Sequence, residues 1–186
     1  MDKKLTTTFQ IDDEITLRAF AEGDAEQVAE AVLRNREHLE IFMHWMTPDY
    51  SVESAKDFVG RSIAAVEEKT GLGFGIFRAR YLIGSIGFVY FDWVAHKTEM
   101  GYWIDKHEEG KGIITNACMH LIQYAFDDLG LNRIEIRCST ENLRSAAIPE
   151  RLGFRKEGVL RQVELRNGRL HDFSVYGLLA DDPRVW

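Results

Sequence analysis

The chain has 186 residues, of which 45% are hydrophobic and 11% aromatic, so it is long enough to bury a sizeable core within one domain. Its 23 Lys and Arg residues are outnumbered by 30 Asp and Glu residues, which gives a formal net charge of −7 at pH 7. A negative charge of this size disfavours nonspecific attraction to nucleic acid and to anionic membrane surfaces. We therefore expect a single domain over residues 1–186, with neither nucleic acid nor a membrane as partner.

Neither a targeting segment nor a metal site is apparent in the sequence. The first eight residues contain no apolar core of signal-peptide length, and no stretch approaches the roughly 18 unbroken apolar residues of a membrane-spanning helix. The two cysteines, Cys118 and Cys138, form no CxxC pair, and the six histidines follow no zinc-binding spacing. These features predict a cytoplasmic protein without a disulfide framework and without a bound metal.

The first part of the chain predicts one short strand and two helices. Residues 15–18 read as a strand, and a helix follows Asp24, because apolar residues then recur on one helical face. An aromatic stretch ends at Pro48 and predicts a loop over residues 45–50. Ser51 follows and can cap a second helix that runs towards residue 66.

The middle of the chain changes from a strand pattern to a helix pattern. Two apolar runs, 73–77 and 82–90, are too short for typical helices and predict a hairpin, and 98–104 continues as another strand. Apolar residues then recur at intervals of three and four, which predicts a helix over 114–129 that ends at Gly130.

The last third predicts three more strands and a short helix. Residues 133–137 alternate strictly between polar and apolar, as a half-buried strand does. A short helix over 145–152 comes next. Two further strands, 154–163 and 172–179, are separated by an Asn-Gly pair, which is the strongest short signal for a hairpin turn.

The segment from His107 to Ile114, which reads HEEGKGII, lies between a predicted strand and a predicted helix. Unpaired backbone N–H groups and the helix dipole favour an anion at such a junction, and glycines let the backbone approach a phosphate. The segment lacks the Lys-Ser/Thr ending of a nucleotide-binding P-loop and the spacing of the dinucleotide fingerprint. Two readings remain at this point: a phosphate cradle, or a glycine turn that only reverses the chain.

Together with the strand that precedes it, this segment resembles a known motif. Residues 99–104, which read EMGYWI, followed by His-x-x-Gly-x-Gly, resemble the acetyl-CoA motif of the GCN5-related N-acetyltransferases (GNAT). The resemblance is closer to the RimJ/RimL branch, which acetylates protein N-termini. It extends in order from about residue 15 to residue 179 through the stretches 142–145, 151–154, 157–161 and 167–168, with Asp172 and Tyr176.

The resemblance implies an α/β GNAT fold, in which a central, mixed, mostly antiparallel sheet of six or seven strands is flanked by helices. It implies acetyl-CoA as cofactor, with coenzyme A as product and no metal. Where the family usually has Gln or Arg at the start of the cradle, this chain has His107, whose side chain either contacts the cofactor or is merely exposed. The residues implied to bind the cofactor, mainly through backbone groups, are Gly101, Tyr102, Trp103, Ile104, His107, Gly110, Lys111, Gly112, Ile113, Ile114 and Asn142.

Two side chains are candidates for the chemistry. An α-amino group, with a pKa of about 7.7–8.0, needs less help to lose a proton than a lysine near 10.4. By resemblance, Glu164 is the general base of a direct attack on the thioester, although it also fits a solvated strand residue. Ser145 is implied to stabilise or protonate the coenzyme A thiolate, and as a plain helix residue it would serve as a cap. We expect Tyr176 to be structural.

The expected function is transfer of acetyl to a protein N-terminal amine, with a ribosomal protein as a candidate target. Two alternatives stay open: acetylation of a small amine such as a polyamine or an antibiotic, and a noncatalytic, regulatory acetyl-CoA-binding module. Residues 45–48 either line the acceptor pocket or cover the core. The family resemblance also leads us to expect a homodimer.

Overall fold

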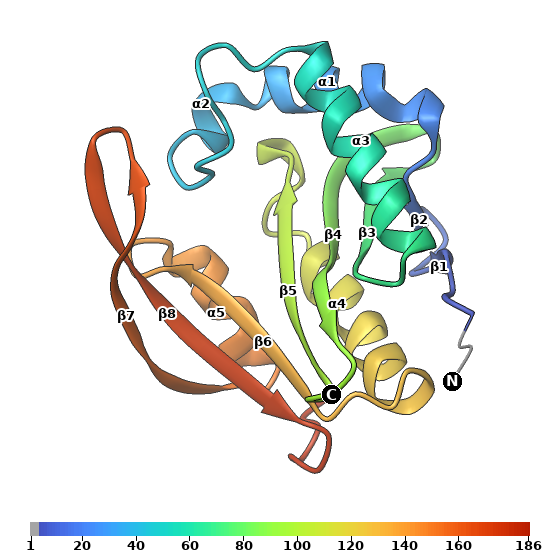
Figure 1. Cartoon of the computed structure of the whole chain (residues 1–186), viewed down its shortest axis with the longest axis vertical. Helices are drawn as coiled ribbons and strands as arrows, with labels where there is room; N and C mark the ends of the chain where they lie inside the picture. Colours follow the sequence, from blue (N-terminus) through green and yellow to red (C-terminus); the bar gives the residue numbers. More distant parts are fainter. Residues whose placement is uncertain (1–3) are drawn as a thin grey trace.

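The computed structural model describes residues 4–186 and contains one eight-stranded sheet with helices on both faces (Figure 1). The strand order is β1-β2-β3-β4-β5-β6-β8-β7, and every neighbouring pair is antiparallel except β5 and β6. The strands are β1 (Thr8–Gln10), β2 (Ile15–Ala19), β3 (Leu72–Arg78), β4 (Tyr81–Asp92), β5 (Lys97–Ile104), β6 (Arg133–Ser139), β7 (Arg155–Arg166) and β8 (Arg169–Leu179).

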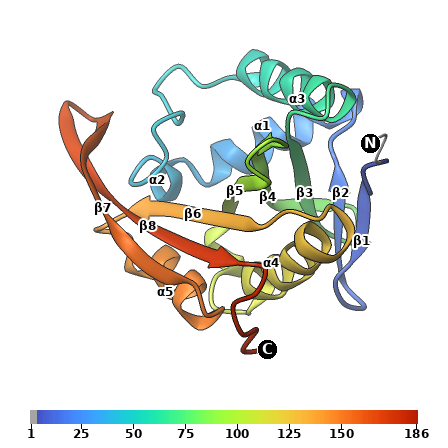
Figure 2. The same cartoon turned by 60° about the horizontal axis from the view of Figure 1, so that its bottom comes forward.

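The helices form two layers. They are α1 (Ala25–Arg34), α2 (Arg36–Leu39), α3 (Val52–Glu67), α4 (Ile113–Gln123) and α5 (Leu143–Arg151), and a wide π turn, Tyr124–Asp128, continues α4. Figure 2 shows α1 and α3 over one face of the sheet and α4 and α5 over the other. Each layer has its own cluster of buried apolar side chains, the larger one on the α4 side. No helix within residues 4–186 is both long and apolar enough to cross a membrane.

The sheet opens between its two parallel strands. β5 pairs with β6 only from Lys97 opposite Arg133 to Met100 opposite Ile136. From Gly101 to Ile104, β5 stays paired with β4 but no longer with β6. The backbone groups that β5 turns towards β6 in this stretch therefore have no strand partner among the described residues, and they can bond to an extended ligand.

The predicted α/β architecture, with a mixed and mostly antiparallel sheet, is confirmed. The sheet has eight strands where six or seven were expected, because the three-residue strand β1 pairs with β2 at the sheet edge. A strand this short has too few residues to show an alternating pattern. α5 begins at Leu143, and Asn142 caps it by accepting a hydrogen bond from the Ser145 N–H at 3.1 Å. The capping role considered for Ser145 is therefore wrong, because that residue lies inside the first turn.

The β7–β8 hairpin reaches beyond the body of the sheet towards the segment after α2 (Figure 1). Its turn has positive φ at both Asn167 and Gly168, as the sequence predicts. β7 carries an irregularity between Leu160 and Glu164, where Gln162 has a φ of 53° and its N–H donates to Asp172 Oδ1 at 2.8 Å. Bulges of this kind bend a strand and redirect the side chains that follow, here Glu164.

Candidate active site

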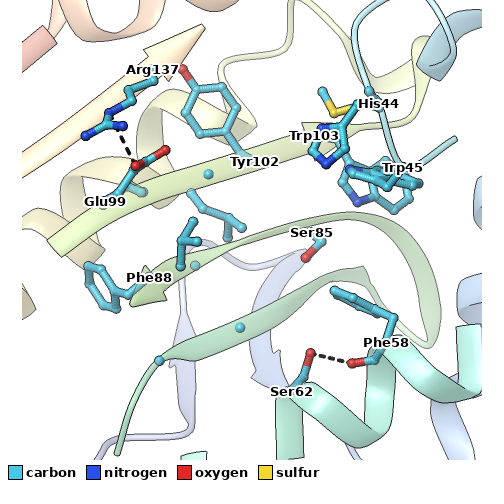
Figure 3. Close-up of a pocket in the computed structure, with 18 of the residues that line it drawn as sticks. His44, Trp45, Phe58, Ser62, Ser85, Phe88, Glu99, Tyr102, Trp103 and Arg137 are labelled. Atoms are coloured by element: carbon cyan, nitrogen blue, oxygen red, sulfur yellow. Dashed lines mark hydrogen bonds and ion pairs between the residues drawn. The ribbon is translucent and has the colours of Figure 1, made fainter. Parts of the chain in front are cut away.

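A cavity of about 910 Å³ lies between α3 and the central strands and extends to the β7–β8 hairpin. Figure 3 shows Phe58 and Ser62 of α3 on one side of it and the strands β4 and β5 on the other. Six of the predicted site residues line this cavity or its opening at the β5–β6 divergence: Gly101, Tyr102, Trp103, Asn142, Ser145 and Glu164. The others, Ile104, His107, Gly110, Lys111, Gly112, Ile113 and Ile114, lie outside the cavity, along the path from β5 to α4.

The turn before α4 has the geometry expected of an anion cradle. Gly110 and Gly112 have φ values of 75° and 76°, in the left-handed region that favours glycine. A Cβ added at either position would meet no atom within 4 Å, so the backbone is open to its surroundings there. The N–H groups of the first turn of α4 have no partner within the helix, and the positive end of the helix dipole lies with them.

The side chains around the cradle are engaged with one another. Lys111 Nζ lies 3.0 Å from Glu108 Oε2, and Arg78 Nη2 lies 2.8 Å from the same oxygen. Burial opposes ionisation of Glu108, but the hydrogen bonds from Lys111 and Arg78 outweigh it and lower the pKa of Glu108. The Lys111 charge is thus already paired, so the attraction for an anion rests on the backbone. The His107 N–H donates to Asp105 Oδ1 at 2.9 Å, which fixes the start of the turn.

Ser145 is held at the β5–β6 opening by Tyr102. The Tyr102 hydroxyl donates to the Ser145 carbonyl at 3.1 Å, and the two hydroxyl oxygens lie 3.4 Å apart. Burial raises the pKa of Tyr102 well above its ordinary value, so its hydroxyl keeps its proton. Burial likewise raises the pKa of the neighbouring Cys138 thiol. Two neutral hydroxyls therefore meet where β5 and β6 separate. The sequence predicted a role for the Ser145 hydroxyl, but for Tyr102 it predicted only backbone contacts.

Glu164 is placed in the cavity by β7 and is held from two sides. Its Oε1 lies 2.7 Å from Arg166 Nη1, and its Oε2 lies 2.9 Å from His44 Nδ1. Its side chain is 17% exposed, so it is not the solvated strand residue of the alternative reading. Neither Arg166 nor His44 was predicted from the sequence as a partner of Glu164. Arg166 had a detectable signal, because residues i and i+2 of a strand share a face, whereas nothing in the sequence relates His44 to β7.

A second carboxylate, Glu99, faces the same cavity from β5. Its Oε2 lies 3.4 Å from Arg137 Nε, and Figure 3 shows the two side chains meeting across β5 and β6. Burial raises the pKa of Glu99, in spite of the nearby Arg137 charge. Strand alternation puts Glu99, Gly101 and Trp103 on one face of β5, so this residue could have been identified from its spacing. Each of the two cavity carboxylates is thus paired with a cation, Glu99 with Arg137 and Glu164 with Arg166.

An aromatic wall closes the end of the cavity next to Glu164. Trp45 packs against Trp103 with ring centroids 6.5 Å apart and against Tyr50 at 6.1 Å. Of residues 45–48, only Trp45 lines the cavity. Met46 is buried in the core, so the reading in which this segment covers the core holds for that residue.

Tyr176 lies outside the cavity. Its side chain is buried, and its hydroxyl donates to Glu150 Oε1 at 2.9 Å. Burial and the Glu150 carboxylate raise the pKa of Tyr176 to about 12. These contacts fit the structural role expected for this residue. Within residues 4–186, no group of three His, Cys, Asp or Glu side chains is placed to hold a metal ion.

The fold is that of an acetyltransferase, and the chain belongs to the GNAT family. The family model described as Acetyltransferase (GNAT) domain matches residues 14–155. The chain is 37% identical over 183 residues to "Putative ribosomal N-acetyltransferase YdaF" of Bacillus subtilis (strain 168), covering 96% of this chain and 97% of the relative.

Two solved structures show the same fold over nearly their whole length. One is "RimL- Ribosomal L7/L12 alpha-N-protein acetyltransferase in complex with Coenzyme A", with a TM-score of 0.88 and 25% identity, covering 95% of this chain and 99% of the other. The second is the microcin C7 self-immunity acetyltransferase MccE in complex with acetyl-CoA and AMP, with a TM-score of 0.88 and 29% identity over 95% and 98% of the two chains. The expected RimJ/RimL likeness and N-acetyltransferase class are thereby confirmed.

Proposed function

We propose that this protein, acting as one domain in the cytoplasm, transfers acetyl from acetyl-CoA directly to the N-terminal amine of a protein, with a ribosomal protein as target. The observation that carries the proposal is the divergence of β5 and β6 after Met100. The anion cradle leads to this opening from one side, and the cavity with its carboxylates meets it from the other. The names of the RimL-type relatives support the choice of a protein target.

The residues of the chain fit the cofactor. The open backbone at Gly110 and Gly112 suits a pyrophosphate, and the free edge of β5 suits the extended pantetheine arm. Bound acetyl-CoA would supply the acyl group as a thioester. Residues proposed to hold it through backbone groups are Gly101, Tyr102, Trp103, Ile104, Gly110, Lys111, Gly112, Ile113 and Ile114, with His107 and Asn142 beside them.

Ser145 and Tyr102 assist the departure of the coenzyme A thiolate. A thiolate at the β5–β6 opening would meet the Ser145 hydroxyl, whose position is fixed by Tyr102. A hydroxyl that donates to an anion makes a hydrogen bond roughly twice as strong as a neutral one. We assign Ser145 to stabilisation of the leaving thiolate for this reason.

The acceptor side suits a cationic amine attached to a longer chain. Glu99, whose Oε2 lies 3.4 Å from Arg137 Nε, is the carboxylate proposed to attract the ammonium form of the amine. The aromatic wall of Trp45 and Trp103 excludes water near the point of transfer. The cavity extends beneath α3 towards Gly71 and Gly73, which leaves room for residues that follow the first one of a peptide.

Acetyl transfer to a panel of peptides that differ in their first residue tests the proposal, with spermidine and a small aromatic amine run alongside. We expect peptides to be acetylated at the α-amine, as mass spectrometry would locate, and small amines to react far more slowly. Transfer to small amines alone would contradict the protein target. Binding of coenzyme A without transfer to any amine would favour the regulatory module instead.

We also propose that the protein forms a homodimer. β7 is an edge strand and exposes a row of apolar side chains with its hairpin partner: Val159, Leu160, Val163, Leu165 and Leu170. Edge strands of this kind are usually protected from open-ended pairing, and a second copy is one means of protection. Light scattering of the purified chain would show a mass near twice that of one chain, and a monomer would contradict the proposal.

A further inference from the structure

The Glu164 carboxylate is occupied as an acceptor on both of its oxygens. Arg166 donates to Oε1 at 2.7 Å, and the Arg166 side chain is only 4% exposed. The same guanidinium donates to the Phe42 carbonyl at 3.1 Å, which ties β7 to the segment after α2. A guanidinium stays charged under all ordinary conditions. Glu164 is therefore fixed in direction and paired with a permanent cation, which suits a group that orients another residue.

His44 is the residue that Glu164 orients. Its Nδ1 lies 2.9 Å from Glu164 Oε2. An ionised carboxylate can only accept, so Nδ1 carries the hydrogen of this bond and the lone pair of the neutral imidazole lies on Nε2. His44 lines the cavity, and Figure 3 shows it next to Trp103 and Trp45, near the end of β5. Its side chain is 64% exposed, so a proton received there can pass on to water.

The chemistry favours an imidazole over a carboxylate for this proton transfer. A general base works best when its pKa is close to the working pH, and an imidazole ordinarily titrates near 6.5 against about 4.3 for a glutamate. An acceptor α-amine is partly neutral at physiological pH. A neutral imidazole nitrogen is therefore matched to the N–H proton that becomes acidic when the amine attacks an acyl carbon.

We propose that Nε2 of His44 takes the proton of the attacking amine and that Glu164 is a positioning residue which sets the tautomer and direction of that imidazole. The assignment rests on the acetyltransferase function proposed above and refines the role expected for Glu164. In the step, the N–C bond forms, the C–S bond breaks, and one N–H proton moves to Nε2. The sulfur leaves as a thiolate facing Ser145, and the imidazolium returns its proton to solvent as the thiolate takes one up.

Two matched substitutions separate the roles. His44→Gln keeps a donor for Glu164 but cannot accept a proton, and we expect kcat to fall by about 100-fold or more with little change in KM for acetyl-CoA. Glu164→Gln keeps the imidazole and removes its orientation, for which we expect a smaller loss of about tenfold. His96→Gln, an exposed histidine in the turn between β4 and β5 and outside the cavity, is the control and should match the wild type.

Chemical rescue distinguishes a proton acceptor from a residue that only supports the loop. His44→Ala should regain activity as imidazole is added to the assay, whereas Glu164→Gln and the control should not respond. His44→Gln activity within about threefold of the wild type would overturn the assignment. So would an imidazole-insensitive His44→Ala, or a Glu164→Gln variant that loses more than His44→Gln.

The activity of the wild-type protein shows whether a negative result concerns the role of His44 or the proposed function as a whole. If the wild type acetylates peptides while His44→Gln does so equally well, the function stands and His44 is not the base. A wild type that acetylates no amine overturns the function and the assignment together. Calorimetric measurement of coenzyme A binding to each variant checks that the variants are folded.

Discussion

At the residue scale, Ser145 depends on Tyr102 for its place. The Tyr102 side chain reaches α5. Its hydroxyl donates to the Ser145 carbonyl and lies close to the Ser145 hydroxyl. Because burial keeps the phenol neutral, it can act as a donor without adding a charge that would have to be compensated. The pair therefore presents a fixed hydroxyl at the opening of the sheet.

Replacement of Ser145 by Ala should slow the reaction without weakening cofactor binding. The lost interaction is a hydrogen bond to a charged sulfur, worth about 1.5–3 kcal/mol, so kcat should fall by about 10- to 150-fold. Steady-state kinetics with a peptide acceptor measures this, and calorimetry with coenzyme A should show an affinity within about threefold of the wild type. An unchanged kcat would remove Ser145 from the chemistry.

At the element scale, Asp105 joins the cradle to the helix layer on the other side of the sheet. It follows β5 and is 5% exposed. Its Oδ2 accepts from Arg34 at 2.8 Å and from Asn35 at 3.0 Å, and its Oδ1 accepts from the His107 N–H. Burial disfavours the charge, but the bonds from Asn35, Arg34 and His107 outweigh it and lower the pKa of Asp105.

The stability that Asp105 contributes should be lost in acid. Because its pKa is lower in the folded chain than in the unfolded one, the contribution is fully present above the ordinary aspartate pKa of about 3.9 and disappears as the pH falls through the folded value. Urea unfolding of the wild type and Asp105→Asn should differ by about 1–3 kcal/mol at pH 7. The difference should shrink below pH 4, and a constant gap would contradict this origin.

Asp13→Asn is the matched control for that experiment. Asp13 is exposed in the turn between β1 and β2, far along the chain from the cradle. Its substitution should leave the unfolding free energy within about 0.5 kcal/mol of the wild type. A similar acid effect in both variants would point to the overall charge of the protein and not to the Asp105 network.

At the scale of the whole molecule, the net charge of −7 sets the long-range electrostatic field of the protein. A protein with this net charge attracts cationic acceptors from solution. The same field repels acidic peptides and nucleic acid. Such long-range electrostatic interactions change the rate at which the acceptor meets the protein more than they change the chemistry at the site.

This attraction predicts a salt-dependent kcat/KM. For a basic peptide acceptor, kcat/KM should fall as ionic strength rises from about 0.02 M to about 0.15 M, because the Debye length shortens to roughly 8 Å. kcat should stay constant, since groups in contact are screened little. An acidic peptide with the same first residue is the control and should show the opposite trend. Equal salt effects on both peptides would contradict long-range steering.

Local patterns were enough for most elements and for the glycine turn before α4. The alternation of 133–137, the Asn167-Gly168 turn and the glycines of the cradle each depend on a few neighbouring residues. The strand and the hairpin turn appear in the structure as predicted, and both glycines have positive φ, because strand period, turn type and φ are properties of short segments. The strand β1 was not predicted, because three residues are too few to establish the alternation of a strand.

What the sequence determined by itself is therefore the order of the elements and the glycine turn before α4, and it named Ser145 and Glu164 as candidates for the chemistry. The tertiary structure decided which of these residues meet. His44 and Glu164 are 120 positions apart and touch only because a bulge in β7 turns the hairpin towards the segment after α2. Tyr102 of β5 reaches Ser145 of α5, and Asp105 after β5 reaches Arg34 of α1, because these helices pack against the sheet. Contacts across layers depend on how packed surfaces face each other, and no short segment of the chain encodes that arrangement.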